Sequence, residues 1–179
     1  MRMNLLYVPF FLLVLCTGTF LLSQTRARDG DSRKFQLSPI VKVSTSKNPT
    51  MDAGRLNVNL LMDGKLPDDG WRSTWTAWFK VDPVVTFDLG VDKKIGIVRI
   101  YFQSTDRADE FAEVKVEVSR DGKQFVDFNE YEGFVTEKGK GAWAEIDLRA
   151  VNARYFRLSP KFQGWGHLWG EVEFWEISK

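Results

Sequence analysis

The chain of 179 residues contains one cysteine and one histidine, and this scarcity excludes several kinds of site. The cysteine, Cys16, lies in an apolar run near the start of the chain. No disulfide, thiol nucleophile or thiolate metal site is therefore expected in the remainder. A zinc centre needs several His or Cys ligands, which the single histidine cannot supply. No serine sits in a nucleophile-elbow pattern either, so we expect a protein that is not an enzyme.

The chain also lacks an excess of charge of either sign. It has 25 basic and 24 acidic residues, and its basic residues form no run. Binding to nucleic acid depends on a basic patch, and adsorption to an anionic membrane depends on a polybasic segment. The sequence therefore indicates no nucleic-acid partner. Aromatic residues, in contrast, make up 14% of the chain and include seven tryptophans, which raises the question of stacking surfaces.

The start of the chain is typical of a secretory signal, with Arg2 before an apolar run at Leu5–Leu22 and a polar stretch after it. Three cleavage points are compatible with the sequence: after Gly18, Ser23 or Ala27. We expect a secreted or cell-surface protein, with an uncleaved membrane anchor as the alternative, because the run is close to the ~18-residue minimum for a span. The expected division is a signal peptide at 1–27, a linker or N-terminal arm at 28–37 and one domain at 38–179.

Alternation with a period of two dominates the rest of the sequence. In residues 95–103, IGIVRIYFQ, it places Val98, Ile100 and Phe102 on one face, and residues 111–119, FAEVKVEVS, alternate in the same way. This pattern is typical of half-buried antiparallel strands. Further strand candidates lie between turn signals: VKVSTS (41–46), VVTFDLG (84–90), KQFVDFNEY (123–131), AWAEIDL (142–148), ARYFRLSP (153–160) and EVEFWEI (171–177).

No segment shows an apolar stripe of helical period with caps at its ends. Helix is expected only as a turn or two between Leu60 and Val81. Roughly seven to nine short strands in a cysteine-free domain predict an all-β fold, either an antiparallel β-sandwich or a barrel.

Three blocks, in this order, resemble one known family. The first is NLLMDGKLPDDGWRSTWTAW followed by DPVVTFDLG, the second KKIGIVRIYFQ followed by FAEVKVEVSRDGKQF, and the third NARYFRLSP followed by GEVEFWEI. Together they resemble the coagulation factor 5/8 type C, or discoidin, domain. The resemblance covers about Ser38 to the last residue and implies a jelly-roll β-sandwich of the galactose-binding-like superfamily. Animal members usually carry a cysteine near each end of the domain. This chain has neither cysteine, which favours the bacterial carbohydrate-binding branch of the family.

Members of this family often hold a structural calcium ion, and the resemblance implies three ligands here: Asp63, Ser73 and Glu171. Calcium takes six to eight hard oxygen ligands, largely carboxylates and carbonyls. These residues are far apart in sequence and would converge only if the two ends of the domain meet, as they do in the family's fold. The alternative is that Asp63 and Gly64 form an ordinary turn and that Glu171 is a solvated strand residue.

The seven tryptophans divide by context. Four are predicted to pack in the core or against an edge of the domain: Trp75, Trp143, Trp169 and Trp175. Three lie in glycine-rich or polar connections, where an indole could stack on a sugar ring: Trp71, Trp78 and Trp165. Three polar residues could donate hydrogen bonds to the same ligand: Arg72, Arg107 and His167. The alternative for the loop tryptophans is that they only seal the loops against the sandwich.

The sequence therefore predicts a non-catalytic carbohydrate-binding module that recognises glycans at loops on one end of the sandwich. A second hypothesis is an adhesion or assembly domain that binds protein or phospholipid through apolar loop tips, as animal members of the family do. A glycoside-active enzyme is the weakest hypothesis. Carboxylates are plentiful, but most of them alternate along strands, where a solvated face explains them.

Overall fold

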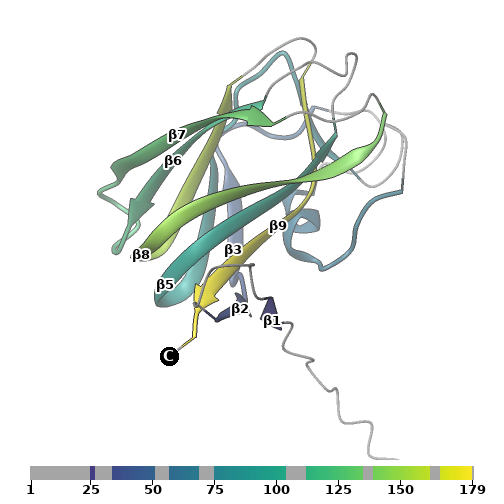
Figure 1. Cartoon of the computed structure of the whole chain (residues 1–179). Helices are drawn as coiled ribbons and strands as arrows, with labels where there is room; N and C mark the ends of the chain where they lie inside the picture. Colours follow the sequence, from purple (N-terminus) through teal and green to yellow (C-terminus); the bar gives the residue numbers. More distant parts are fainter. Residues whose placement is uncertain are drawn as a thin grey trace, which may run out of the picture.

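Figure 1 shows the protein as a computed structural model. It describes residues 25–26, 34–50, 57–68, 75–103, 112–134, 139–161 and 166–178. Most of the expected signal peptide lies outside these residues, so that expectation stays a prediction. Within them, no helix is long and apolar enough to cross a membrane.

The described chain is built from strands and one short 3₁₀ helix, η1. In chain order the elements are β1 (Thr25–Arg26), β2 (Phe35–Ser38), β3 (Lys42–Thr45), η1 (Val58–Met62), β4 (Thr76–Phe79), β5 (Val85–Gln103), β6 (Ala112–Ser119), β7 (Val126–Phe134), β8 (Gly141–Lys161) and β9 (Gly166–Ile177). All the strand pairs are antiparallel. The all-β prediction is confirmed, and the single short helix agrees with the expected turn or two.

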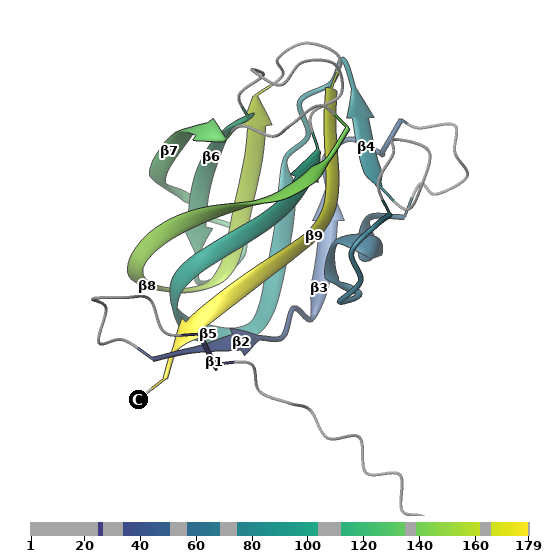
Figure 2. The same cartoon turned by 45° about the vertical axis from the view of Figure 1, so that its right-hand side comes forward.

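Two long strands, β5 and β8, each contribute to both layers of a sandwich (Figures 1 and 2). The first part of β5 pairs with β3 and with the end of β8, which also pairs with β6. The second part of β5 pairs with β9 and with the start of β8. We call the layer that contains β2, β9 and β4 the front layer and the layer that contains β3, β6 and β7 the back layer.

The sequence predicted each of these long strands as two separate strands, because a bend interrupts the alternation. In β5 the bend follows Gly90, whose φ is +82° and whose N–H donates to Asp88 Oδ1 at 2.7 Å. In β8 it falls at Arg149 and Ala150, which have φ values of +49° and +70°. These left-handed conformations turn the strand without ending it, so one strand passes from one layer to the other.

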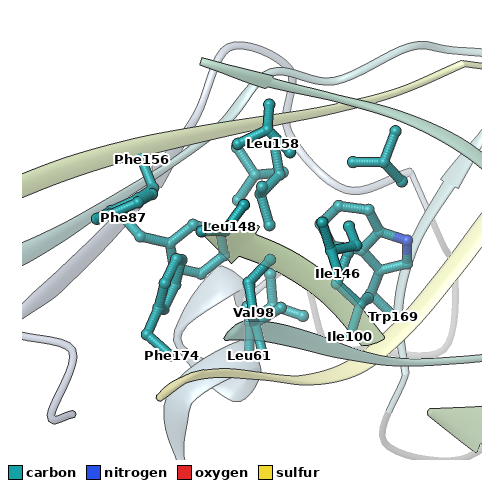
Figure 3. Close-up of a cluster of buried hydrophobic side chains, with 14 of the residues drawn as sticks. Leu61, Phe87, Val98, Ile100, Ile146, Leu148, Phe156, Leu158, Trp169 and Phe174 are labelled. Atoms are coloured by element: carbon teal, nitrogen blue, oxygen red, sulfur yellow. The ribbon is translucent and has the colours of Figure 1, made fainter. Parts of the chain in front are cut away.

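The core lies between the layers and is formed by the residues that the alternation placed inward (Figure 3). Phe174 of the front layer packs between Phe87 and Phe156 of the back layer, with ring centroids 5.3 and 4.9 Å apart. All three rings are fully buried. Burying each large apolar side chain stabilises the fold by roughly 1.5–3 kcal/mol, so these side chains hold the layers together.

Trp143 is half-buried on the outer face of the front layer, so its predicted place in the core is wrong. Its ring centroid lies 5.2 Å from that of Tyr101 and 4.2 Å from Arg99 Cζ. The parity of the strand explains the error: Ile146 and Leu148 point into the core, so odd-numbered residues of this segment point outward. The other three tryptophans predicted to be buried are buried: Trp75, Trp169 and Trp175.

The domain begins earlier than the sequence predicted. Phe35 is 1% exposed and packs with Ile97 and Trp175, and β2 pairs with β9. The last three residues of the segment 28–37, expected to be a linker or an N-terminal arm, thus form part of a strand of the sheet. A four-residue strand is too short for alternation to reveal, and only its pairing with the distant β9 identifies it. Strand β1 falls within the expected signal peptide, so cleavage after Ala27 would remove it.

Candidate functional site

Several strand ends meet at one end of the sandwich, which we call the loop end (upper end in Figures 1 and 2). Gln103, the last residue of β5, pairs with both Gly141 and Leu168 near the starts of β8 and β9. Beside them, Ala112 of β6 pairs with Phe134 of β7. The strand ends that flank residues 104–111, 135–138 and 162–165 are therefore neighbours in space.

Two of the predicted ligand residues, Arg107 and Trp165, fall in the gaps between these strand ends. Five of the predicted site residues lie outside the described residues: Trp71, Arg72, Ser73, Arg107 and Trp165. For His167 only the backbone is described, in β9 opposite Trp78. The structure thus brings together the strand ends that flank Arg107 and Trp165, and the roles of these two side chains remain predictions.

Trp78 is fully buried, so the prediction that it stacks on a ligand is wrong. It lies in β4, its ring meets that of Trp169 edge-on at 5.9 Å, and its Nε1–H donates to the carbonyl oxygen of Lys47 at 2.9 Å. The apolar surface of the indole is thus packed against other side chains, and its N–H group has a hydrogen-bond acceptor inside the protein. The burial of Trp78 could not be predicted from the sequence, because β4 shows no alternation. Three of its residues in a row are buried: Thr76, Ala77 and Trp78.

The glycine-rich connection to which the sequence assigned Trp165 ends at Gly166, where β9 begins. The glycines of β9 allow close packing. A Cβ on Gly166 would lie 2.9 Å from Phe79 Cα and still closer to the carbonyl oxygen of Trp78. A Cβ on Gly170 would lie 2.5 Å from Pro67 Cδ. Glycine inside a strand often marks such a close approach of another part of the chain.

We expect Gly170→Ala to lower the free energy of unfolding by about 2 kcal/mol, because Pro67 is rigid and cannot move out of the way. Gly64→Ala is the control: a Cβ there has no neighbour within 4 Å, and only its φ of +73° opposes it, at a cost of about 1 kcal/mol. Urea denaturation of both variants measures the difference. A Gly170 variant as stable as the wild type would contradict the close packing.

Two of the three predicted calcium ligands do come together. Asp63 is the C-cap residue of η1, and Glu171 lies in β9, which η1 contacts through the fully buried Leu61. The N–H of Gly64 donates to Glu171 Oε2 at 3.2 Å. Sequence reasoning missed the role of this backbone amide, which nothing in a side-chain pattern signals. The convergence of two distant segments that the family resemblance implied is thus present in the structure.

Glu171 is a buried carboxyl group, only 5% exposed, and its pKa is raised to about 8. Burial is the main cause, because it disfavours the charged form. The neighbouring carboxylates of Asp63 and Glu173 add repulsion, and the hydrogen bond from Gly64 opposes the shift. Among the described residues no lysine or arginine pairs with Glu171, so its negative charge is not compensated there.

A hard divalent cation fits this arrangement, because a buried carboxylate beside a second carboxylate is what such an ion would neutralise. Asp63 and Glu171 would hold it. The described residues contain no group of three or more His, Cys, Asp or Glu side chains that could bind a metal, so further oxygens would have to come from elsewhere. At this position the ion would join η1 to β9 and stabilise the connection after Asp63.

The fold and the site together define an antiparallel β-sandwich of the galactose-binding-like kind. The chain matches the F5/8 type C domain over residues 41–174, and it belongs to that family. No curated protein matches the sequence.

Several solved structures share the fold. The CBM32 of AlyQ in complex with 4,5-unsaturated mannuronic acid matches with a TM-score of 0.57 and 18% identity, over 77% of this chain and 96% of that one. The lectin domain of lectinolysin complexed with Lewis B antigen matches with a TM-score of 0.56 and 22% identity, over 76% and 93%. CpGH89CBM32-5 of Clostridium perfringens, in complex with GalNAc-β-1,3-galactose, matches with a TM-score of 0.57 and 17% identity, over 77% and 98%.

The match to a truncated AlyQ with CBM32 and alginate lyase domains has a TM-score of 0.58 and 18% identity. It covers 81% of this chain but 34% of that one, so this chain spans about a third of the two-domain protein. At sequence identities of 17–22%, these structural similarities establish the fold alone.

Proposed function

We propose that this protein is a non-catalytic carbohydrate-binding module with its ligand site at the loop end of the sandwich. The observation that carries the proposal is the family match over residues 41–174, within which the strand ends beside 104–111 and 162–165 converge. The sugar-bound structures that share the fold support a glycan as the class of ligand.

Recognition would combine stacking of a sugar ring on an indole with a few hydrogen bonds. With Trp78 buried, the remaining candidates for stacking are Trp71 and Trp165. The candidates for hydrogen bonding remain Arg72, Arg107 and His167. A shallow site of this kind binds with millimolar to micromolar dissociation constants, or about −4 to −8 kcal/mol. The module would bind the glycan without making or breaking a covalent bond.

Calcium at Asp63 and Glu171, with Ser73 as a third ligand, would be a structural part of the module. The uncompensated buried carboxylate of Glu171 supports this part of the proposal. Secretion is proposed from the signal-like sequence at residues 1–27, which would place the module where extracellular glycans occur.

A glycan array followed by affinity electrophoresis of the full chain tests the function. We expect Trp165→Ala to weaken binding to the best glycan at least tenfold, which corresponds to about 1.4 kcal/mol. Trp143→Ala is the matched control, because Trp143 is a half-buried indole on the outer face of the front layer, and it should bind within about twofold of the wild type.

Two outcomes would contradict the proposal: no glycan is retained, or Trp165→Ala and Arg107→Ala both bind as the wild type does. If vesicles are bound instead, and the same two variants abolish that binding, the module is an adhesion domain that uses its loop tips on phospholipid. Release of free sugar during the assay would show that it is an enzyme.

A further inference from the structure

Two short segments meet at the loop end beside β4: residues 46–50, which follow β3, and residues 80–84, which lead from β4 to β5. We call the two segments together the corner. The N–H of Ser46 donates to the carbonyl oxygen of Val84 at 3.0 Å, and the N–H of Val84 donates to Ser46 Oγ at 2.9 Å. The two segments are therefore joined directly to each other.

Further hydrogen bonds attach the corner to β4. The N–H of Thr50 donates to the carbonyl oxygen of Ala77 at 2.8 Å, and the N–H of Phe79 donates to Thr50 Oγ1 at 2.7 Å. The indole of Trp78 donates to the carbonyl oxygen of Lys47. Neither segment of the corner forms a helix or a strand, yet these bonds hold both segments on the sandwich. Loops that a rigid scaffold positions in this way often carry binding residues.

The corner adjoins the proposed glycan site. Phe79, the last residue of β4, pairs with Gly166, the first residue of β9. Because the two strands are antiparallel, Lys80 follows Phe79 at the point where the 162–165 connection joins β9 (Figure 2). Trp165 immediately precedes Gly166 in the chain. Lys80 therefore lies beside the start of the strand to which the proposed stacking residue is attached.

Lys80 has a backbone conformation that lysine rarely adopts. Its φ is +55°, in the left-handed region, which costs a residue with a Cβ about 1 kcal/mol, whereas glycine adopts it freely. Strained residues of this kind cluster at active sites and ligand clamps. The side chain of Lys80 is exposed, so burial of the lysine does not compensate for the strain. A lysine at this position therefore indicates that its side chain recognises something at the surface.

The exposed side chains of the corner carry more positive than negative charge. Its exposed charged residues are Lys47, Lys80 and Asp82, and the amide of Asn48 is exposed next to Lys47. A lysine ammonium has three hydrogen-bond donors and no acceptor, and it bonds a carboxylate more strongly than it bonds a neutral hydroxyl, because both partners are then charged. The chemistry of the corner therefore fits a ligand group of negative charge.

We propose that the corner is an acidic-sugar subsite of the glycan site. Lys80 binds the carboxylate of a uronic acid, Lys47 adds positive charge from the same corner, and a sugar ring stacks at the neighbouring 162–165 connection. The inference rests on the proposed function, because it names the class of glycan that this site takes. It predicts that the module prefers glycans with uronic acid residues to neutral glycans of the same size.

The test measures how the full chain binds a trisaccharide of galacturonic acid and the methyl ester of this trisaccharide, which keeps the sugar rings but removes the charges. We expect the wild type to bind the acid about tenfold more tightly than the ester, because only the acid offers Lys80 a carboxylate. Lys80→Gly should bind both forms with about the affinity of the wild type for the ester. Isothermal titration calorimetry at low salt measures the dissociation constants.

Lys80→Gly also separates recognition from folding. Glycine adopts a φ of +55° without strain, so the variant should unfold at about the same temperature as the wild type, as circular dichroism measures. Lys80→Arg keeps the charge and should keep most of the preference for the acid. Lys123→Gly is the matched control, because it removes an exposed lysine from the turn between β6 and β7 at the opposite end of the sandwich. This control should bind the acid as the wild type does.

Three results would overturn the inference while the glycan function stands. The wild type binds acid and ester equally, or Lys80→Gly loses the same affinity for both forms, or Lys123→Gly weakens binding of the acid as much as Lys80→Gly does. In the last case the net charge of the chain explains the preference, and the corner does not. If no glycan is bound, whether charged or neutral, the proposed function fails and the inference fails with it.

Discussion

Replacing Trp78 with alanine is expected to lower the free energy of unfolding by about 4 kcal/mol. The indole is fully buried, and removing it leaves a cavity against Trp169, whose ring it meets at 5.9 Å. The carbonyl oxygen of Lys47 also loses its hydrogen-bond donor, 2.9 Å away. Chemical denaturation monitored by circular dichroism measures the loss.

Trp143→Ala is the control for this substitution. Trp143 is half-buried on the outer face, and its neighbours Tyr101 and Arg99 can close over the vacated surface, so we expect a loss of about 1 kcal/mol. The comparison also separates a core role from a ligand role. A stable Trp78→Ala protein that has lost glycan binding would restore the interpretation that the sequence favoured and the structure overturns.

In calcium-free buffer the protein is expected to become less stable as the pH rises from about 4.5 to about 8. The folded pKa of Glu171 is about 8, above its usual value of 4.5, so in this window the folded state holds a proton that the unfolded state has released. Stability falls with pH wherever the folded state binds more protons. Because one pKa unit corresponds to 1.36 kcal/mol, the loss is on the order of 4 kcal/mol by pH 8.

Calcium should reverse this loss, because the ion favours the ionised carboxylate of Glu171. We expect added calcium to raise the melting temperature at pH 8 and to have little effect at pH 5, where Glu171 is protonated. Glu171→Gln keeps an acceptor for the Gly64 amide but removes the charge. This variant should lose both the pH dependence and the calcium response. Differential scanning calorimetry in chelator and in calcium measures both.

A flat pH profile in Glu171→Gln that still responds to calcium would place the ion elsewhere in the molecule. Magnesium is a useful control at the same concentration. Magnesium demands near-octahedral geometry and dehydrates reluctantly, so the site at Asp63 and Glu171 should respond to it less than to calcium.

Much of the fold could be predicted because alternation in a strand is a local property. The inward-facing side chains of the strand segments around Val98, Val116 and Phe174 are buried, as the period-two pattern predicts. The pattern failed where a strand is buried on both faces, as at Trp78, or where a glycine marks close packing, as at Gly166. In those places the neighbours that decide exposure come from distant strands.

In the candidate sites, too, local sequence patterns predicted only part of what the tertiary structure shows. The carboxylates Asp63 and Glu171 could be paired in advance only through the family resemblance, because no local pattern joins residues so far apart. The uncompensated burial of Glu171 appears only once η1 packs against β9.

The sequence by itself determined that this protein is an all-β domain with most strand faces assigned, because residue order sets which side chains share a face. The order of its motif blocks supplied the resemblance to the F5/8 type C domain. Only the tertiary structure decided which of the described tryptophans are buried and which carboxylate is buried without a counter-charge. The physical reason is that exposure and electrostatic potential depend on every neighbour in space. In this fold those neighbours come from strands more than a hundred residues apart, such as β2 and β9.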